Sequence, residues 1–497
     1  MILLSILTLS FLLFSLLIFK YEQTKKKYTQ FPGWEQFVPP LWFAKRLPTF
    51  IRPHVNDALQ VMWSHAREGY LKFGDTFKLV FPSLAYVFVS DPEFSKFVAL
   101  NHDKYFEKNM KRSQAVRQVI GNNVFNSIED SIWKRHRMLL NPAFSDKTMF
   151  VVADATTLVA QQLIQQIDAD ADRDVISDMS NLTLNAGFGH DFDAFSTESQ
   201  SDPKSVMNSQ ARFFYNGTFF ALFPKFMRSE KFRFIPFLDQ YFSDLNTFSD
   251  AVNKIIEERL VGSENENNDI LSLLINAAKS TRLDQVPDDS RPLSNKEMVS
   301  NCLMFIVAGH ETTARTLAFG FRLLALNRHI QKRAQLHVDQ VLGSAEHPTY
   351  EQMDQLTFIH NIMNETLRLY PAAVGTERIV IREFEFKNRK FPVGTHCLIH
   401  WNNMQRDDKY FENANDFRPE RWDLDANKQK SFANTAFGVG KRSCIGKRFA
   451  EVEMVFVFAM ILKRFNVECV DEMSELDLEV NMTLMAKTPI KLRFTKR

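Results

Sequence analysis

The spacing of apolar residues changes along the chain and predicts a mixed protein. Short apolar runs within 77–90, "FKLVF" and "AYVFVS", are typical of β-strands. From about residue 92 to 370 apolar residues recur mainly at helical spacing, most clearly in 150–168 and 296–327. Strand signals return at 377–400, where "NRKFPVGT" predicts a turn. The pattern indicates a mainly α fold with a smaller β-sheet region.

One helix is expected to be long. Residues 281–293 are polar, contain two prolines and predict a surface loop. Ser294 and Glu297 then form the S-x-x-E pattern of a capping box. From there the helix could run to about Asn327, which is roughly 45 Å at the standard rise. Because it is apolar on most faces, we expect it to cross the middle of the molecule.

The N-terminus has a different pattern, because residues 1–19 contain no charged side chain. A helix of that length just spans the roughly 30 Å hydrocarbon core of a bilayer. A cleaved signal peptide is the competing interpretation, but it would need a basic start and a small-residue cleavage site. Four lysines within 20–27 follow, so the positive-inside rule places the rest of the chain in the cytosol. We expect a single-pass anchor at 1–20, in the endoplasmic reticulum membrane, a linker at 21–48 and one large domain at 49–497.

Composition narrows the function. The net charge of +2 gives no bulk attraction for nucleic acid, and we expect none as a partner. The four cysteines have neither the spacing of a disulfide framework nor a paired CxxC zinc pattern, which is typical of folding in a reducing compartment. Phe occurs 47 times against 6 Trp and 10 Tyr, so we expect it both in the core and around an apolar pocket or lipid-facing surface.

The stretch "AFGVGKRSCIG" at 436–446 has three competing interpretations. A phosphate-binding loop needs G-x-x-x-x-G-K-[ST], but Thr435 occupies the first Gly position and Arg442 the Ser/Thr position. A lone Cys is most often a small buried apolar residue. Cys444, however, precedes a predicted helix, whose N-terminal N–H groups and dipole favour a thiolate. With no Cys or His nearby it is a poor zinc ligand and a good axial ligand for haem iron.

The same stretch resembles the haem-binding loop of the cytochrome P450 family, F-x-x-G-x-R-x-C-x-G. It matches at Phe437, Gly440, Arg442, Cys444 and Gly446. The resemblance implies the cytochrome P450 fold, with Cys444 as axial ligand of a haem b iron. It also implies that Arg442 meets a haem propionate and that Phe437 packs near the sulfur. Gly440 and Gly446 would let the backbone approach the haem closely.

A second motif resembles the family's structural triad. "ETLRLYP" places Glu365 and Arg368 at i, i+3 on one helical face, and "FRPERW" supplies Arg421. An isolated E-x-x-R is often only an exposed ion pair, worth about 0–1 kcal/mol. The resemblance implies that these three residues lock the region of the Cys loop onto the helix.

The predicted long helix carries "AGHETT", which resembles the family's oxygen-activation motif. Ala308 and Gly309 are small and leave room for dioxygen and substrate. The Glu311 carboxylate and the Thr312 hydroxyl can pass the two protons that O–O cleavage needs. The alternative is a buried helix in which Thr bonds its own carbonyls.

Further residues fit the same family. "SIWKRHRMLLNPAF" places Trp133 and Arg137 at i, i+4, like the family's W-x-x-x-R helix that contacts a propionate; the alternative is an exposed cationic helix face. Arg378 in "GTERIV" matches a further propionate-binding Arg, more loosely. His310 is expected to be structural or substrate-facing, with distal iron ligation as the alternative. Arg315 has no assigned role.

The motifs occur in the family's order and imply a haem-thiolate monooxygenase that inserts one oxygen atom from O2 into a lipophilic substrate. No flavin module is evident after the Cys loop, so we expect electrons from NADPH through a separate NADPH–cytochrome P450 reductase, with cytochrome b5 as a further partner. Lys441, Lys447 and Arg448 could dock an acidic partner or form a solvated helix start. The alternatives are an isomerase or dehydratase that needs no reductase, and a non-catalytic haem protein. The acid–Thr pair argues against both.

Substrate identity is not specified by the sequence. By resemblance, residues 104–124 and 212–242 build the pocket and its entry channel. Twelve of the 31 residues in 212–242 are Phe or Tyr. An apolar pocket or mouth of this kind suits a steroid, fatty acid, terpenoid or xenobiotic.

Overall fold

The computed structural model describes most of the chain, and the chain forms two compact units that interleave along the sequence. The described residues are 2–34, 66–81, 84–108, 117–128, 130–167, 172–188, 225–261, 292–423, 434–470, 476–480 and 483–497, with single positions between 206 and 220, between 271 and 275, and at 432. Unit 1 contains Met1–Asn109, Val374–Ala414 and Lys430–Ser443, and unit 2 contains Met110–Ala373, Asn415–Gln429 and Cys444–Arg497. No single linker therefore divides the region 49–497.

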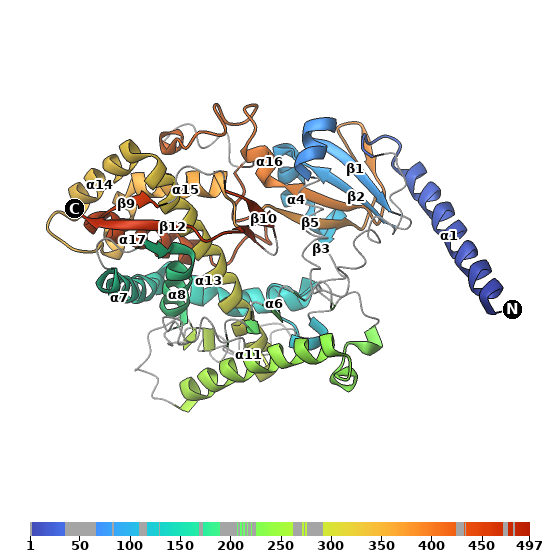
Figure 1. Cartoon of the computed structure of the whole chain (residues 1–497), viewed down its shortest axis with the longest axis horizontal. Helices are drawn as coiled ribbons and strands as arrows, with labels where there is room; N and C mark the ends of the chain where they lie inside the picture. Colours follow the sequence, from blue (N-terminus) through green and yellow to red (C-terminus); the bar gives the residue numbers. More distant parts are fainter. Residues whose placement is uncertain are drawn as a thin grey trace. The chain divides into compact units, whose positions relative to one another are not determined.

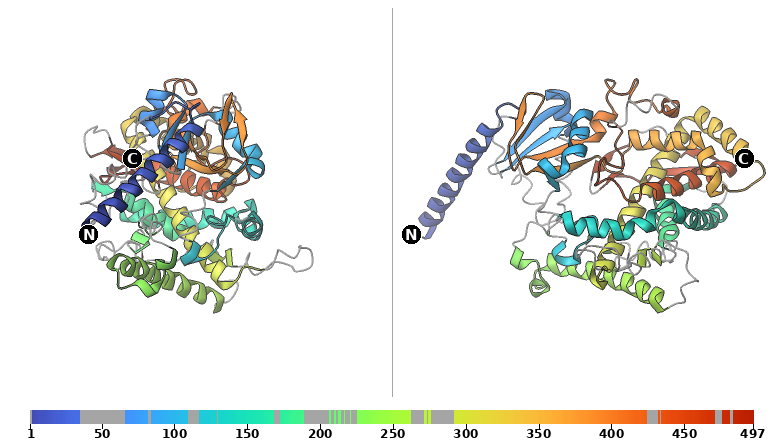
Figure 2. Two further views of the ribbon diagram at one scale, coloured as in Figure 1. Left: turned by 90° about the vertical axis from the view of Figure 1, so that its right-hand side faces the viewer. Right: turned by 180° about the vertical axis from the view of Figure 1, so that it is seen from behind.

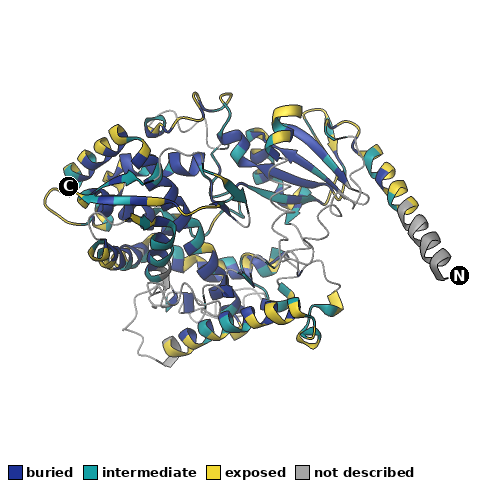
Figure 3. Ribbon diagram, viewed as in Figure 1, coloured by how far each residue is buried: buried dark blue, intermediate teal, exposed yellow. Residues whose placement is uncertain are grey.

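Unit 1 is built on a five-stranded sheet with the order β1-β2-β8-β5-β3 (Figure 1). Strands β2 and β8 pair in parallel, and the other neighbours pair antiparallel. All of β8 is buried, and most of the sheet is dark blue in Figure 3. The strands predicted within 77–90 are confirmed. The bounds are Thr76–Phe81 (β1), Leu84–Val89 (β2), Phe106–Lys108 (β3), Gly375–Val380 (β5) and His396–His400 (β8).

Aromatic rings fill the space between helix α4 (Pro92–Tyr105) and the hairpin of β6 (Phe384–Phe386) and β7 (Arg389–Phe391). The Phe384 and Phe391 rings stack at 4.8 Å, and Phe94 lies 5.3 Å from Phe391. Many of the 47 Phe side chains therefore pack in the hydrophobic core. The predicted turn "NRKFPVGT" is wrong in part, because its residues 389–391 form β7. The tight turn lies at Lys387 and Asn388, whose φ angles are 47° and 59°.

The predicted anchor lies in helix α1 (Ile2–Lys27). Where the structure describes side chains, it contains no helix long and apolar enough to cross a membrane. The side chains of residues 2–14 lie outside that description. After α1 the chain joins the core of unit 1: the Tyr28 hydroxyl lies 2.9 Å from Thr395 Oγ1, and the buried Lys78 ammonium donates to the Tyr28 carbonyl at 3.0 Å. Residues 35–48 of the predicted linker are not among those described.

Unit 2 is mainly helical, with small sheets at its C-terminal part. The three-stranded sheet has the order β4-β12-β9, and β10 pairs with β11. Helix α11 lies at the edge of the helical unit in both views of Figure 2. The helices are α6 (Asp130–Leu140), α7 (Met149–Gln166), α8 (Val175–Phe188), α11 (Pro236–Val261), α13 (Asn295–Leu326), α14 (Arg328–Leu342), α15 (Thr357–Leu369) and α17 (Lys447–Arg464). The strands are Asp172–Asp174 (β4), Phe465–Cys469 (β9), Leu478–Val480 (β10), Leu484–Ala486 (β11) and Lys491–Lys496 (β12).

Helix α13 is the central element of unit 2. It begins with the predicted capping box, in which Ser294 and Glu297 bond each other reciprocally, and it ends at Leu326 as predicted. It packs against α8, α11, α15 and α17, and most of its side chains are buried. The predicted surface loop before it falls largely on 276–291, which lie outside the described residues.

Candidate active site

One strip of α13 is open, although most of the helix is buried. Ala308 is exposed, and Gly309 and Thr312 are partly exposed. A Cβ atom placed on Gly309 would meet no heavy atom within 4 Å. Ala308 and Thr312 are four residues apart and lie on one helical face. Small side chains here leave space beside a buried helix, which is the arrangement that a bound small molecule needs.

The Thr312 hydroxyl is held within the helix. Its Oγ1 donates to the Ala308 carbonyl at 2.8 Å, and Thr316 Oγ1 donates to the Thr312 carbonyl at 2.8 Å. This is the backbone-bonding arrangement that was the alternative to a relay role. To reach a bound molecule, the Thr312 hydroxyl has to exchange this hydrogen bond for another.

Glu311 is held by an ion pair that gives Arg315 a partner. The Arg315 guanidinium lies 2.5 Å from Glu311 Oε1 and also donates to Thr483, whose hydroxyl donates to Glu311 at 3.3 Å. His310 is buried, and its Nδ1 lies 3.0 Å from the Ile306 carbonyl, which gives it a structural partner. Burial lowers the pKa of His310, so the ring is neutral at pH 7.

Cys444 lies two residues before Gly446, the N-cap of α17, as predicted. Its side chain is exposed, yet the surrounding protein raises the pKa of the thiol by desolvation. The Gly446 N–H and the charges of Arg137 and Lys447 act in the opposite direction. The helix terminus and these two cations therefore favour the thiolate, as the sequence predicts, while desolvation opposes it.

Helix α6 presents the predicted Trp133 and Arg137. Trp133 is buried, Arg137 is half-buried, and the Arg137 charge acts on the Cys444 sulfur. The alternative of an exposed cationic face does not hold for Arg135, which is buried and pairs with Glu297 of the α13 cap. Helix α6 is thereby fixed to the start of α13.

Unit 1 contains a group of cations close enough to repel one another. Arg378 on β5 is the register partner of Lys108 on β3, and both feel the charge of Arg442. Burial, with the other cations adding to it, lowers the pKa of Arg378 to about 10 and that of Lys108 to about 7. Glu377, whose charge acts on Arg378, is bound to His396 at 2.5 Å. The group therefore concentrates positive charge at this edge of the sheet.

A buried donor beside these cations lacks a hydrogen-bond partner among the described residues. Arg378 donates through Nη1 to Thr376 Oγ1 and to the Glu377 carbonyl, but its buried Nε meets no acceptor there. His102 lies nearby, and burial and the cations lower its pKa to about 4, so its ring is neutral and its Nδ1 faces Asp103. An unpaired buried N–H is costly, so Arg378 Nε indicates a missing acceptor.

The backbone conformation and packing of unit 1 require glycine at two positions of the Cys loop. Gly438 and Gly440 have φ angles of 72° and 77°, which side chains rarely adopt. A Cβ on Gly440 would lie 3.0 Å from the Ala99 carbonyl of α4. Gly446 is less restricted, since a Cβ there would meet only a ring atom of Phe144 at 3.8 Å. The half-buried Phe437 and Arg442 belong to the same loop.

The predicted structural triad is assembled in unit 2. Glu365 and Arg368 are fully buried and joined by two hydrogen bonds of 2.9 and 2.8 Å. Arg421 Nε donates to Glu365 at 2.8 Å. The motif did not indicate two further donors, the Trp422 indole and the Arg418 N–H, both at 2.9 Å. One carboxylate therefore accepts five hydrogen bonds from the 417–422 segment and its own helix.

Sequence reasoning also missed Glu453 on α17. Its side chain is fully buried, and neither carboxyl oxygen meets a hydrogen-bond partner among the described residues. Burial raises its pKa well above the ordinary value of a carboxyl group. The only signal in the sequence is an acidic residue within the apolar run "VEMVFVFAM". Lys108 and His102 had no motif to mark them.

Comparison with known families is consistent with this site. The sequence profile described as "Cytochrome P450" matches residues 39–494. Cytochrome P450 3A5 of Homo sapiens is 27% identical over 457 residues, covering 88% of each chain. Cytochrome P450 3A41 of Mus musculus is 28% identical with the same coverage. The bifunctional cytochrome P450/NADPH–P450 reductase 2 of Bacillus subtilis (strain 168) is 30% identical over 85% of this chain and 39% of its own length. The chain belongs to the cytochrome P450 family, and it is a monooxygenase of that family whose cofactor is a haem held by a cysteine thiolate.

The residues present fit that cofactor. In unit 2, Cys444 is exposed and α13 has an open strip of small residues. In unit 1, Lys108, Arg378 and Arg442 lie close enough to act on one another, and Arg378 Nε has no acceptor among the described residues, which suits a haem propionate.

Proposed function

We propose that this protein is a membrane-anchored monooxygenase that hydroxylates a lipophilic substrate with electrons from NADPH. The observation that carries the proposal is the open strip at Ala308, Gly309 and Thr312 on an otherwise buried helix, with Glu311 beside it. Haem supplies the activation of dioxygen when it is bound. In the proposal Cys444 ligates its iron, while Trp133, Arg137, Arg378 and Arg442 bind the propionates.

The proposed proton path uses two side chains of α13. Thr312 turns its hydroxyl from the Ala308 carbonyl toward the open strip and donates its proton there. Glu311, positioned by Arg315 and Thr483, restores that proton from solvent. The Glu365, Arg368 and Arg421 cluster has a structural role, since it holds the 417–422 segment to α15.

We further propose that the electrons come from a separate NADPH–cytochrome P450 reductase, with cytochrome b5 as a second donor. The Bacillus subtilis relative supports this, because its name joins a cytochrome P450 to an NADPH–P450 reductase in one chain. Lys441 is already paired with Asp103, and Arg448 lies near Asp146 and Asp354. Lys447, 58% exposed and 3.8 Å from Glu451, is the better candidate for contact with an acidic partner.

The proposed substrate is a steroid, fatty acid, terpenoid or xenobiotic, and the proposed location is the endoplasmic reticulum membrane. The aromatic segment 212–242 divides into two parts. Phe220 stacks on Tyr241 at 4.2 Å in the core, whereas Phe226 and Phe234 are 70% and 77% exposed. The exposed rings would lie toward the lipid from which such a substrate enters.

Thr312→Ala, compared with Thr316→Ala, tests the function. With reductase and a converted substrate, Thr312→Ala should consume NADPH but release mostly reduced oxygen instead of product. Thr316→Ala, which removes only a backbone-directed hydrogen bond, should stay coupled. Equal coupling in wild type and Thr312→Ala would refute the relay. Turnover that needs no reductase would favour the isomerase or dehydratase alternative.

A further inference from the structure

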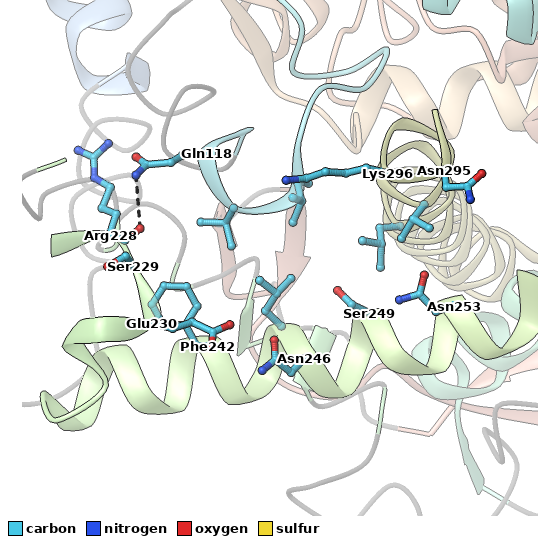
Figure 4. A pocket seen from close by; sticks show the side chains of 15 residues that line it. Gln118, Arg228, Ser229, Glu230, Phe242, Asn246, Ser249, Asn253, Asn295 and Lys296 are labelled. Carbon is cyan, nitrogen blue, oxygen red and sulfur yellow. Dashed lines mark hydrogen bonds between the residues drawn. The ribbon is translucent and has the colours of Figure 1, made fainter. Parts of the chain in front are cut away.

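Unit 2 contains a cavity of about 630 Å³ that the haem and oxygen-activation motifs do not account for (Figure 4). Residues 118–120, 228–230 and Phe242 of its lining fall in the segments expected to build the substrate pocket and entry channel, but the cavity faces away from the open strip of α13. This volume is in the range of sites that bind organic molecules of drug size. Helix α11 forms one side, the N-terminal part of α13 another, and the segments 118–120 and 228–230 complete it. The lining residues are Gln118, Val119, Ile120, Arg228, Ser229, Glu230, Phe242, Leu245, Asn246, Ser249, Asn253, Asn295, Lys296, Val299 and Leu303.

The cavity and the open strip lie on opposite faces of α13. Val299 and Leu303 line the cavity, and Ala308 and Thr312 each follow nine residues later. Nine residues at about 100° each amount to two and a half turns, so the two pairs point in opposite directions. They are also separated by about 14 Å along the helix axis. A molecule in the cavity therefore does not occupy the place of the reacting substrate.

Lys296 is the charged group best placed to receive a ligand in this cavity. Its aliphatic stem lies over Gly121, where a Cβ would come within 3.4 Å of Lys296 Cε. Figure 4 shows the side chain extending from α13 across the cavity. The residues that the structure describes place no carboxylate in an ion pair with it. The adjacent Glu297 does not pair with Lys296, because it forms an ion pair with Arg135 and accepts hydrogen bonds from Ser294 at 2.9 Å.

The rest of the lining combines an apolar surface with neutral donors. Phe242 and Leu245 of α11 and Val299 and Leu303 of α13 supply apolar surface, while the α11 amides and hydroxyl add hydrogen-bonding groups. Two cations and one carboxylate line the cavity, so its net charge is positive. Such a lining suits a molecule with an apolar ring body and a negatively charged group.

We propose that this cavity binds an amphipathic organic anion, with the anionic group at Lys296 and the apolar body between α11 and α13. The site goes beyond the monooxygenase function and is separate from the substrate site. Because both sites share α13, its ligand is an effector and not a competitor of the substrate.

Equilibrium dialysis of the haem-loaded full chain tests the proposal. The protein is reconstituted in phosphatidylcholine vesicles, and binding to protein-free vesicles is subtracted. The probe is 8-anilinonaphthalene-1-sulfonate, and its control is N-phenyl-1-naphthylamine, the same ring system without the sulfonate. We expect one saturable sulfonate site per haem. Lys296→Met should weaken sulfonate binding about tenfold, as expected for one charge-assisted hydrogen bond, and leave binding of the neutral analogue unchanged.

Two matched variants and one competitor complete the test. Lys254→Met removes an exposed α11 lysine outside the lining and should leave the affinity for both dyes unchanged. Ser249→Trp should fill the cavity and abolish saturable binding of both. Imidazole, added to ligate the haem iron, should not displace the sulfonate. Displacement by imidazole, or equal affinity for the sulfonate in Lys296→Met and wild type, would overturn the proposal. An unchanged Soret spectrum in each variant shows that the haem site is intact.

Discussion

Removing the Glu365 carboxylate should destabilise the protein more than almost any other single change on α15. Five donors converge on this carboxylate at 2.8–2.9 Å, and both Glu365 and Arg368 have no exposed surface. In Glu365→Ala the Arg368 charge stays buried without its counter-ion, and the Trp422 indole loses its acceptor. Breaking a buried pair in this way costs about 3–5 kcal/mol. This is a large share of the roughly 5–15 kcal/mol that stabilises a typical protein.

Urea denaturation followed by far-UV circular dichroism measures the effect. The matched control is Arg333→Ala, because Arg333 pairs with Glu420 in the same short helix η7 (Pro419–Trp422), but both side chains are at least 40% exposed. Exposed pairs contribute about 0–1 kcal/mol, so this variant should unfold close to wild type. Glu365→Gln, which keeps the shape and one acceptor, should fall between the two. A loss in Glu365→Ala no larger than that in Arg333→Ala would refute the reasoning.

The remaining predictions concern buried ionisable groups. In haem-free protein the lowered pKa of Lys108, about 7, means that the folded state binds fewer protons than the unfolded state between pH 7 and the ordinary lysine pKa of 10.5. Its urea midpoint should therefore rise over that range, and Lys108→Met should remove the Lys108 contribution to the rise; an unchanged profile would contradict the assignment. Haem titration of Lys108→Met should also show weaker haem retention than in Lys104→Met, an exposed lysine on α4. The folded-state pKa of Glu453 is raised, so its contribution to stability falls as pH rises above about 4.5. Glu453→Gln should therefore gain stability relative to wild type as pH rises from 4 to 7, whereas Glu451→Gln, whose carboxyl is less buried but also has a raised pKa, should show the same trend with a smaller amplitude.

The sequence predicted the long helix and the main strands because local signals and the tertiary structure agree there. The capping box at Ser294 marked the start of α13, and short apolar runs marked β1 and β2. The hairpin at 384–391 was only partly predicted, since a strand of three residues has too few positions to show alternation. The buried ring of Phe391 holds β7 in place by packing against Phe94 and Phe31, which are far away in the sequence.

The residues of the candidate site were also only partly predictable from the sequence. Cys444, Thr312 and Glu365 stand in motifs, whereas Lys108 and Glu453 acquire their chemistry only from burial. No spacing rule marks a lysine on a short strand that pairs with Arg378. The surroundings of Cys444 show the same limit, because the helix terminus is visible in the sequence and the desolvation that raises its pKa is not.

The spectrum of the reduced, carbon monoxide-bound protein tests the central claim most directly. Wild type should show the red-shifted Soret band of a thiolate-ligated haem, and Cys444→His should move the band to the position typical of an imidazole ligand. Cys302→Ser, which removes a buried cysteine of α13, should leave the spectrum unchanged. A wild-type band at the imidazole position, or a red-shifted band that survives in Cys444→His, would contradict the assignment of Cys444 as the iron ligand.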